Sequence, residues 1–301
     1  MIVIGEENLT KQIRDLWKDN YSEMDPKYID FVFRNIYQPE YLYCDKEGDQ
    51  VRASLLRIPH AMMFNDRVLA CSYITGITER AEGQAEQELI PTVIDACENS
   101  ELITLASVRN AGYLAKHGFE KVYSRCDYLL QKKDFKPITN FGCAYDPSPL
   151  DMLKIYSVFV RRFNGFSARH VEDFVNLKKE AAARGGKVVA YYDEKNRICA
   201  YAVIIVTPDD AIIEECIYLD ASGLMKMLNA AFQERSLVHL VVSEAENLRP
   251  LFPKAARNVL WTTMARLNDA DLFSRLFSIP AANVKEAYEV SKKPLFYNEG
   301  F

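Results

Sequence analysis

A six-residue stretch, residues 80–85, narrows the folds open to this chain more than any other part of the sequence. Arg80, Gly83 and Ala85 give it the pattern Arg-x-x-Gly-x-Ala, between a strand-like apolar segment (68–78) and a segment with helical spacing from about residue 84. A loop that leads into a helix has unpaired backbone N–H groups and the positive end of the helix dipole, and small residues let a phosphate approach them. The pattern therefore predicts a phosphate-binding loop in an α/β fold. The alternative is that Gly83 only forms a turn.

A second pattern follows thirty residues later, where residues 110–119 begin with Asn110 and end with Gly118 and Phe119. It resembles the Asn-x-x-Ala…Gly-Phe segment of the GNAT superfamily of acyl-CoA N-acyltransferases, which forms a short helix, a glycine turn and the next strand. In that superfamily an Arg/Gln-x-x-Gly-x-Gly/Ala loop binds the pyrophosphate of acetyl-CoA. Both segments occur here in the family's order and approximate separation. The resemblance implies an N-acetyltransferase with acetyl-CoA as co-substrate.

The pattern of apolar residues predicts an α/β (α+β) chain with tandem GNAT-like folds, each a mixed central sheet flanked by helices. We expect an acyl-CoA-binding domain over residues 1–133, a degenerate GNAT-like domain over 148–266 and a short C-terminal segment over 267–301. A stretch rich in Lys, Pro, Asn and Gly separates the first two. The second domain has the element order of the first but nothing like the Arg-x-x-Gly-x-Ala loop, so we expect it to be structural or pocket-forming.

Two local features make sharper predictions. Asn65 and Asp66 lie between two strand-like runs and predict a hairpin turn. Pro91 lies inside the helical pattern that begins near Gln84, and it predicts a kink or a late start of that helix, because proline has no N–H.

The tandem arrangement resembles the enhanced-intracellular-survival (Eis) type of acetyltransferase, in which a domain resembling a sterol carrier protein follows. Only 35 residues follow Arg266 here, too few for an independent core. The chain is therefore similar to a shortened Eis-like enzyme with a remnant of the third domain. Because Eis-like relatives assemble into homo-oligomers, the resemblance also implies possible self-association.

The resemblance assigns the co-substrate contacts to two segments. The strand from Tyr73 to Ile77 would pair with the pantetheine arm as an added strand does. The loop amides would bind the diphosphate, with Arg80 either a direct phosphate partner or a solvated charge. The loop between Thr78 and Arg80 is about two residues shorter than in many members. The full predicted set is Tyr73, Ile74, Thr75, Gly76, Ile77, Arg80, Glu82, Gly83, Gln84, Ala85 and Asn110.

The catalytic groups are harder to assign. In the family a tyrosine precedes the Gly of Gly-Phe by four residues, but here that position is Leu114 and the tyrosine is Tyr113. One residue on a helix is about 100° of rotation, so Tyr113 is either the re-aimed acid or a packing residue. In Eis-like enzymes the C-terminal carboxylate, commonly on Phe, lies in the active site. Phe301 is therefore a candidate base, or alternatively an apolar anchor.

Aromatic and acidic residues together suit a cationic amine. The candidates are Trp17 and Glu23 in the N-terminal helices and Glu299 in the tail, although helical spacing of the aromatics also fits core packing.

Composition excludes several other classes. A net charge of −5 argues against nucleic-acid binding. Seven scattered cysteines without a C-x-x-C pair and four isolated histidines predict neither a disulfide framework nor a metal site. No signal peptide and no membrane span is visible, so we expect a cytoplasmic protein that does not contact membranes.

We therefore expect transfer of an acetyl group from acetyl-CoA to a primary amine by direct attack in a ternary complex. The rival interpretation is a non-catalytic protein that binds acyl-CoA or another small ligand, which Leu114 favours. A tRNA-dependent peptidyl transferase of the Fem type also has tandem GNAT folds, but the position of the phosphate loop and the acidic charge disfavour it. The sequence leaves the identity of the amine open.

Overall fold

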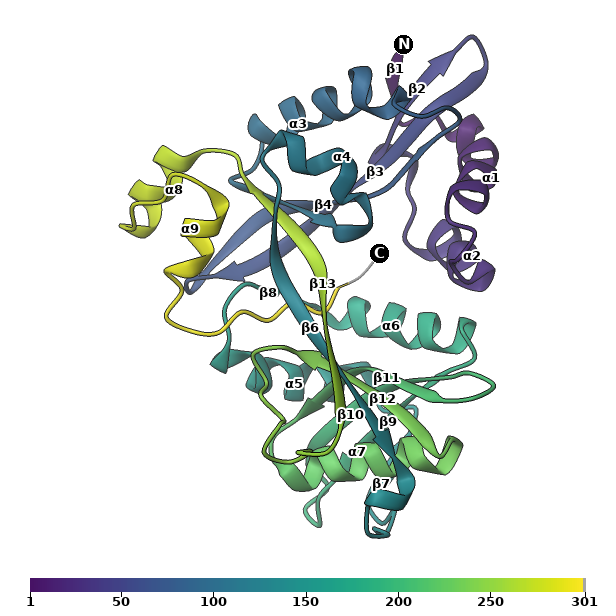
Figure 1. Ribbon diagram of the computed structural model, residues 1–301, viewed down its shortest axis with the longest axis vertical. Helices are drawn as coiled ribbons and strands as arrows, with labels where there is room; N and C mark the ends of the chain where they lie inside the picture. The colour runs from purple at the N-terminus through teal and green to yellow at the C-terminus, as the bar shows by residue number, and fades with distance from the viewer. Residues whose placement is uncertain (300–301) are drawn as a thin grey trace.

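One continuous mixed sheet runs the length of the computed structural model, which describes residues 1–299 (Figure 1). Within these residues the strand order is β1-β2-β3-β4-β5-β13-β6-β12-β11-β10-β9-β7, and β8 pairs with β3. The strands are β1 (Ile2–Ile4), β2 (Leu42–Glu47), β3 (Gln50–Phe64), β4 (Arg67–Glu79), β5 (Ile103–Ser107), β6 (Glu120–Gln131), β7 (Cys143–Tyr145), β8 (Phe166–Ser167), β9 (Lys187–Tyr192), β10 (Ile198–Val206), β11 (Ala211–Tyr218), β12 (Leu237–Ser243) and β13 (Ala256–Leu267). The helices are α1 (Thr10–Asn20), α2 (Pro26–Asn35), α3 (Ile90–Glu98), α4 (Ala111–Leu114), α5 (Pro149–Phe159), α6 (Val171–Ala183), α7 (Ala221–Glu234), α8 (Ala270–Phe277) and α9 (Val284–Glu289).

Helices cover both faces of the first half of the sheet. Successive side chains of β2 point to opposite faces of the sheet, and both faces are apolar. Leu42 and Cys44 pack with α1 and α2, while Tyr43 packs with α3 on the other face. β4 and β5 are parallel, and α3 connects them. This arrangement confirms the predicted α/β class with a mixed sheet flanked by helices.

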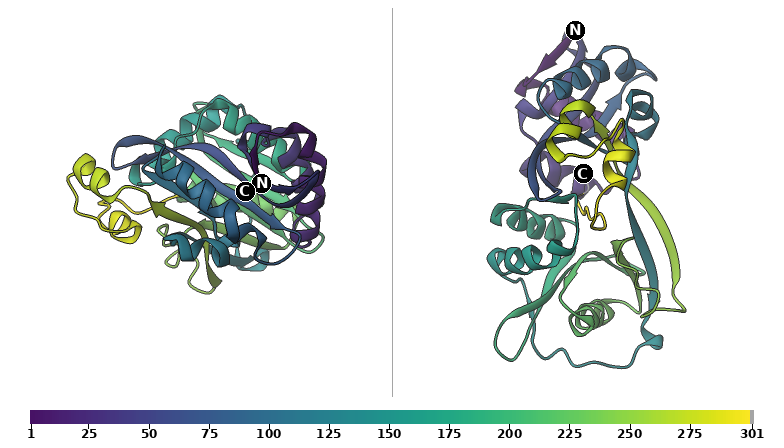
Figure 2. Two further views of the ribbon diagram at one scale, coloured as in Figure 1. Left: turned by 90° about the horizontal axis from the view of Figure 1, so that it is seen from above. Right: turned by 90° about the vertical axis from the view of Figure 1, so that its left-hand side faces the viewer.

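The second half of the chain repeats this plan. β11 and β12 are parallel and α7 connects them, just as α3 connects β4 and β5. Helices α5 and α6 lie on one side of these strands and α7 on the other (Figure 2). β6 and β13 are shared, since β6 pairs with β12 and β13 while β13 pairs with β5 and β6. The domain boundaries at 133, 148 and 266 remain predictions, and the sheet itself continues across them.

The C-terminal helices have no core of their own. Phe273 of α8 and Val284 and Tyr288 of α9 belong to one buried cluster with Phe64 of β3 and Leu105 of β5. The segment after residue 267 therefore depends on the first half of the sheet for its burial.

Both local predictions are confirmed. Asn65 and Asp66 have φ angles of 45° and 61°, as a tight hairpin turn between β3 and β4 requires. The helix after the glycine loop begins as a π-helical turn, η3 (Ala85–Leu89), and becomes α-helical only at Ile90, with Pro91 in its first turn. The helix is continuous through this point, because the Ile90 N–H donates to the Ala85 carbonyl, and Pro91, which has no N–H, lies where π-helical bonding gives way to α-helical bonding.

Candidate functional site

β4 and β5 separate shortly after they meet, which leaves a wedge between them. Only Tyr73–Leu105 and Ile74–Ala106 are paired. The register of β3 against β4 shifts between Ser54 and Leu56, opposite a bulge that contains Gly76. A bulge bends its strand, so β4 turns away from β5 at this point.

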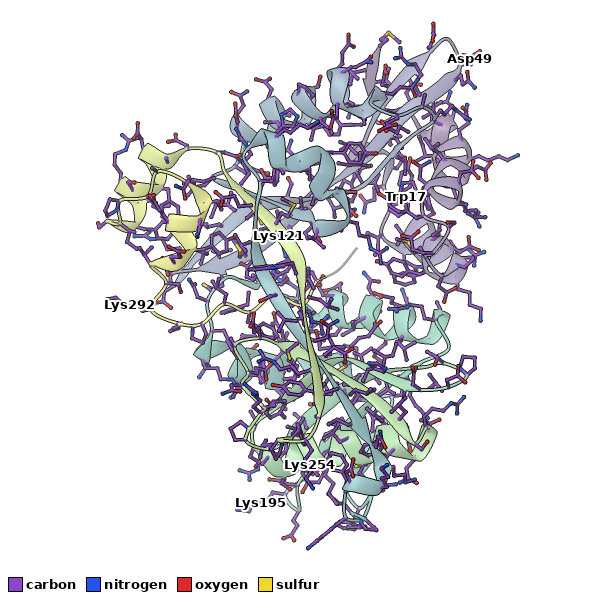
Figure 3. All side chains as sticks on the ribbon, viewed as in Figure 1. Trp17, Asp49, Lys121, Lys195, Lys254 and Lys292 are labelled. Carbon is purple, nitrogen blue, oxygen red and sulfur yellow. The ribbon has the colours of Figure 1, made fainter. Side chains whose placement is uncertain are left out.

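Glycine is required at the bulge for two reasons. Gly76 has φ +63°, and a Cβ there would lie 1.9 Å from Cζ2 of Trp17. Trp17 itself is 1% exposed and lies on the side of α1 that faces the sheet (Figure 3). Edge contacts with the rings of Tyr21 and Phe33 hold it in place. The structure therefore places Trp17 behind the wedge as a packing residue, and its predicted role in amine binding stays a prediction.

The end of α1 covers the edge of β4 that we expect to meet the pantetheine arm. The Asn20 side chain donates to the Glu79 carbonyl over 3.1 Å and accepts from the Glu79 N–H over 3.0 Å. The Tyr21 hydroxyl donates to the Ile77 carbonyl over 2.9 Å. Tyr73 and Ile74, which belong to the predicted set, pair with β5, and the pairing with β5 within residues 1–299 ends at Ile74.

The glycine loop converges on an anion, and that anion belongs to the chain. The Gly83 N–H donates to one carboxylate oxygen of Glu79 over 3.0 Å, and the Ala85 N–H donates to the other over 2.9 Å. The Tyr113 hydroxyl donates to the same carboxylate over 3.2 Å. We call the N–H groups of Gly83 and Ala85 the amide cradle. Its occupant, Glu79, is 9% exposed and sits at the start of η3, where the helix dipole favours negative charge.

The other predicted loop residues make local contacts. The Ala81 N–H donates to the Gln84 side chain, and the Gln84 N–H donates to the Ala81 carbonyl, so that amide is already paired. Arg80 is exposed, and its Nε donates to the Val51 carbonyl over 2.6 Å. Glu82 is also exposed. The expected contacts of a diphosphate with the backbone of Glu82 and with the side chain of Arg80 remain predictions.

Carboxylates dominate the charge at this loop. Glu79, Glu82, Glu86 and Glu88 fall within ten residues. The Lys116 ammonium lies 3.0 Å from Glu86 and offsets one of them. A diphosphate at this loop would meet like charge, and removal of any one carboxylate would lower that repulsion.

The Asn110–Phe119 segment contributes two polar side chains near the wedge. Asn110 is buried; its Oδ1 accepts from the Tyr21 hydroxyl over 3.2 Å, while its Nδ2 has no partner within residues 1–299. Leu114 is buried against α3, and Tyr113 packs at the edge of the same cluster while its hydroxyl reaches the amide cradle. Burial, and then the charge of Glu79, raises the pKa of Tyr113. Its hydroxyl thus lies at the cradle, where a phosphate would be, and its role as the acid stays a prediction.

The chain end passes between the two halves of the sheet. Phe296 packs into the core of the second half, and the next residue, Tyr297, packs into the first between Tyr73 and Tyr123. Such alternate anchoring fixes the path of the tail toward the wedge. Phe301, the candidate base, lies outside the described residues.

A buried ion pair anchors the tail at this point. Arg169 makes two bonds of 2.8 and 2.7 Å to Glu215, and its Nε donates to Glu299 over 2.6 Å. Asn298 donates to Glu215 over 3.0 Å. Burial alone would raise the pKa of Glu215, but the charge of Arg169 holds it below its ordinary value. Glu299, predicted to bind the amine, is thus already paired with Arg169.

The remaining acidic candidate lies at the outer end of the wedge. Glu23 is exposed and forms an ion pair of 3.0 Å with Arg109.

No group of three or more His, Cys, Asp or Glu side chains within residues 1–299 is arranged to hold a metal ion. No helix in that range is long and apolar enough to cross a membrane.

Sequence reasoning missed the contacts that fill the site, which Glu79, Asn20 and Tyr21 make. Glu79 carried a weak signal, because it directly precedes Arg80 and ends a strand that points at the loop. Asn20 and Tyr21 carried none, since only the packing of α1 brings them to β4.

Comparisons with known proteins agree with this geometry. No family model matches the sequence, and no curated protein matches it. Solved structures do match. A conserved protein from Enterococcus faecalis V583, described as a probable N-acyltransferase, has a TM-score of 0.73 at 14% identity and covers 89% of this chain and 72% of its own.

Two further structures extend the likeness. A GCN5-related N-acetyltransferase from Kribbella flavida has a TM-score of 0.69 at 13% identity, over 89% of this chain and 70% of its own. Eis1 from Mycobacterium abscessus has a TM-score of 0.66 at 11% identity, over 91% and 75%. Taken with the wedge and the amide cradle, these matches show that the chain has the fold of the GCN5-related (GNAT) N-acetyltransferases.

Proposed function

We propose that this protein is an acetyl-CoA-dependent N-acetyltransferase that acts on a primary amine by direct attack in a ternary complex. The amide cradle carries the proposal. Two loop amides and a tyrosine hydroxyl converge on one anionic group at a helix N-terminus, directly beside the wedge between β4 and β5. A loop that holds a carboxylate in this way has the donors that a phosphate needs.

Binding of acyl-CoA then requires an exchange of anions. The Glu79 carboxylate must leave the amide cradle and the diphosphate must replace it. Asn20 and Tyr21 must release the backbone of β4 before a pantetheine arm can pair there. The affinity for acyl-CoA is therefore the affinity of the open site reduced by the fraction of molecules in which Glu79 is out.

The chemical step needs a neutral amine near the thioester carbonyl. We assign proton removal to the terminal carboxylate of Phe301, as the Eis resemblance implies. The described part of the tail supports this assignment, because Tyr297 packs against Tyr73 of β4. Tyr113 would donate to the diphosphate once Glu79 leaves. The CoA thiolate is a tolerable leaving group, so the absence of a tyrosine at position 114 slows the reaction without preventing it. Acidic side chains around the wedge favour a cationic acceptor.

A second function is favoured by the same observations read differently. It is a non-catalytic protein that binds acyl-CoA or another small ligand, and the buried Leu114 in place of the family's tyrosine favours it.

Calorimetry with CoA and acetyl-CoA, together with turnover on a panel of amines, tests the proposal. Gly83→Val should abolish the heat of binding, because φ is +83° and the side chain would stand in the loop. Gly185→Val is the matched control: φ is +76°, a Cβ meets nothing within 4 Å, and the position lies in the second half of the chain. It should bind as the wild type does.

Three outcomes separate the hypotheses. Heat with turnover supports the transferase. Heat without turnover on any amine supports the non-catalytic protein. No heat with the wild type or with Glu79→Ala, in which the cradle is open, rejects both.

A further inference from the structure

Part of β13 forms a long sheet edge in the middle of the molecule. β5 pairs only with residues 263–267 of β13, and β6 pairs with residues 256–265. Among the described strands, residues 256–261 therefore have a neighbour on one side only, and we call them the free edge. In the right-hand view of Figure 2 the ribbon of β6 and β13 runs along one side of the molecule between its two halves.

The hydrogen-bond pattern shows which backbone groups point outward. The Glu244 N–H donates to the Ser124 carbonyl, so the even-numbered residues of β6 direct their groups to β12 and the odd-numbered ones to β13. Their partners on β13 are Ala256, Asn258 and Leu260. The alternation along a strand then turns the N–H and C=O groups of Arg257, Val259 and Trp261 away from β6. No other described strand pairs with them.

The free edge has few of the devices that usually protect strand edges, and Arg257 is its one charged residue. The outermost strands of the sheet, β1 and β7, are three residues each. The free edge is six residues, all exposed, with no proline, lysine or bulge until the register shift after Trp261. Val259, Leu260 and Trp261 are 39%, 48% and 46% exposed. An exposed apolar edge of this kind is a template for another strand.

We propose that the free edges of two copies of this chain pair antiparallel about a two-fold axis at Val259. In that register Val259 lies opposite itself, and Arg257 of each copy lies opposite Trp261 of the other. All three outward-facing residues then find hydrogen-bonded partners. The Arg257 guanidinium, which contacts Cys126 and Glu244 of its own chain, then turns to the indole face of Trp261 in the other copy, a favourable cross-strand pair. This self-complementarity selects a second copy over an unrelated strand, and the two sheets become one.

Sedimentation equilibrium tests the proposal on the full chain. The wild type should have about twice the 34.5 kDa mass of one chain at micromolar concentrations. Val259→Pro should be monomeric, because it removes an outward N–H and leaves the pairing with β6 intact. Val259→Lys should also be monomeric, because it places like charges opposite each other. Phe141→Lys is the control: Phe141 is 77% exposed, far from the free edge, and its loss should leave the dimer intact.

Cross-linking tests the register. In a Cys126→Ser background, because Cys126 lies opposite Val259 on β6, Val259→Cys should oxidise to a disulfide-linked dimer. Asn258→Cys in the same background should not, because its counterpart is a diagonal neighbour about 7–8 Å away. A monomeric wild type, a dimer that survives both Val259 variants with normal circular dichroism, or cross-linking at 258 in preference to 259 overturns the proposal.

Discussion

Replacement of Glu79 by alanine should tighten the binding of acyl-CoA, although it removes a buried hydrogen-bonded group. Under the proposed exchange of anions, a diphosphate must first displace the Glu79 carboxylate from the N–H groups of Gly83 and Ala85. Each charge-assisted bond contributes about 1.5–3 kcal/mol, and solvation of the departing carboxylate returns much of it. A net displacement cost of about 2 kcal/mol makes binding to Glu79→Ala about thirtyfold tighter.

The same variant should be less stable without ligand. Loss of the carboxylate that caps the loop amides costs about 1–2 kcal/mol, as loss of a helix cap does. Thermal unfolding should therefore begin at a lower temperature in the apo protein, while calorimetry gives a smaller Kd for CoA. Opposite signs in the two measurements are the signature of a group that competes with the ligand.

Glu82→Ala is the matched control. It removes the same charge from the same loop, but Glu82 is exposed and bonds to neither cradle amide. Its effect should be about twofold and should disappear as salt is raised. If Glu79→Ala changes the Kd no more than Glu82→Ala does, the carboxylate does not occupy the diphosphate position and the reasoning fails.

Three further variants test the framework of the site. Gly76→Ala should unfold at lower denaturant, by several kcal/mol, since its Cβ would overlap the α1 tryptophan and φ is +63°; a change below about 1 kcal/mol would contradict the bulge geometry. Glu215→Ala should cost about 3–5 kcal/mol in urea unfolding because it leaves Arg169 buried and uncompensated, whereas loss of the exposed Glu289, which pairs with Lys285, should cost under about 1 kcal/mol. Burial raises the pKa of Glu246 from 4.5 to about 7, so the folded state binds a proton more tightly than the unfolded state. The free energy of unfolding should therefore fall by up to about 3 kcal/mol as the pH rises from 4.5 to 7. Glu246→Gln should flatten that part of the stability profile, and an unchanged profile would refute the shift.

Local chemistry made several elements predictable. Asparagine and aspartate tolerate positive φ, which fixed the β3–β4 turn, and the missing N–H of Pro91 fixed the late start of α3. The glycine loop was also predictable, because a small-residue loop between a strand and a helix leaves backbone N–H groups that converge, here those of Gly83 and Ala85.

Other features depend on contacts between segments far apart in the chain. The sharing of β6 and β13 by both halves of the sheet is one, since nothing in residues 256–267 specifies a place between β5 and β6. The pairing of Glu299 with Arg169 is another, because the two residues are separated by 130 positions and meet only where the tail crosses the sheet.

The sequence by itself determined that this chain is an α/β protein with an anion-binding loop, because backbone geometry near glycine, proline and a helix N-terminus is a local property. Only the tertiary structure decided what that loop holds. Side-chain packing brought Glu79 to the amide cradle and α1 to the edge of β4. The order of residue types along the chain does not specify which of several possible acceptors lies next to a given N–H group in the folded protein.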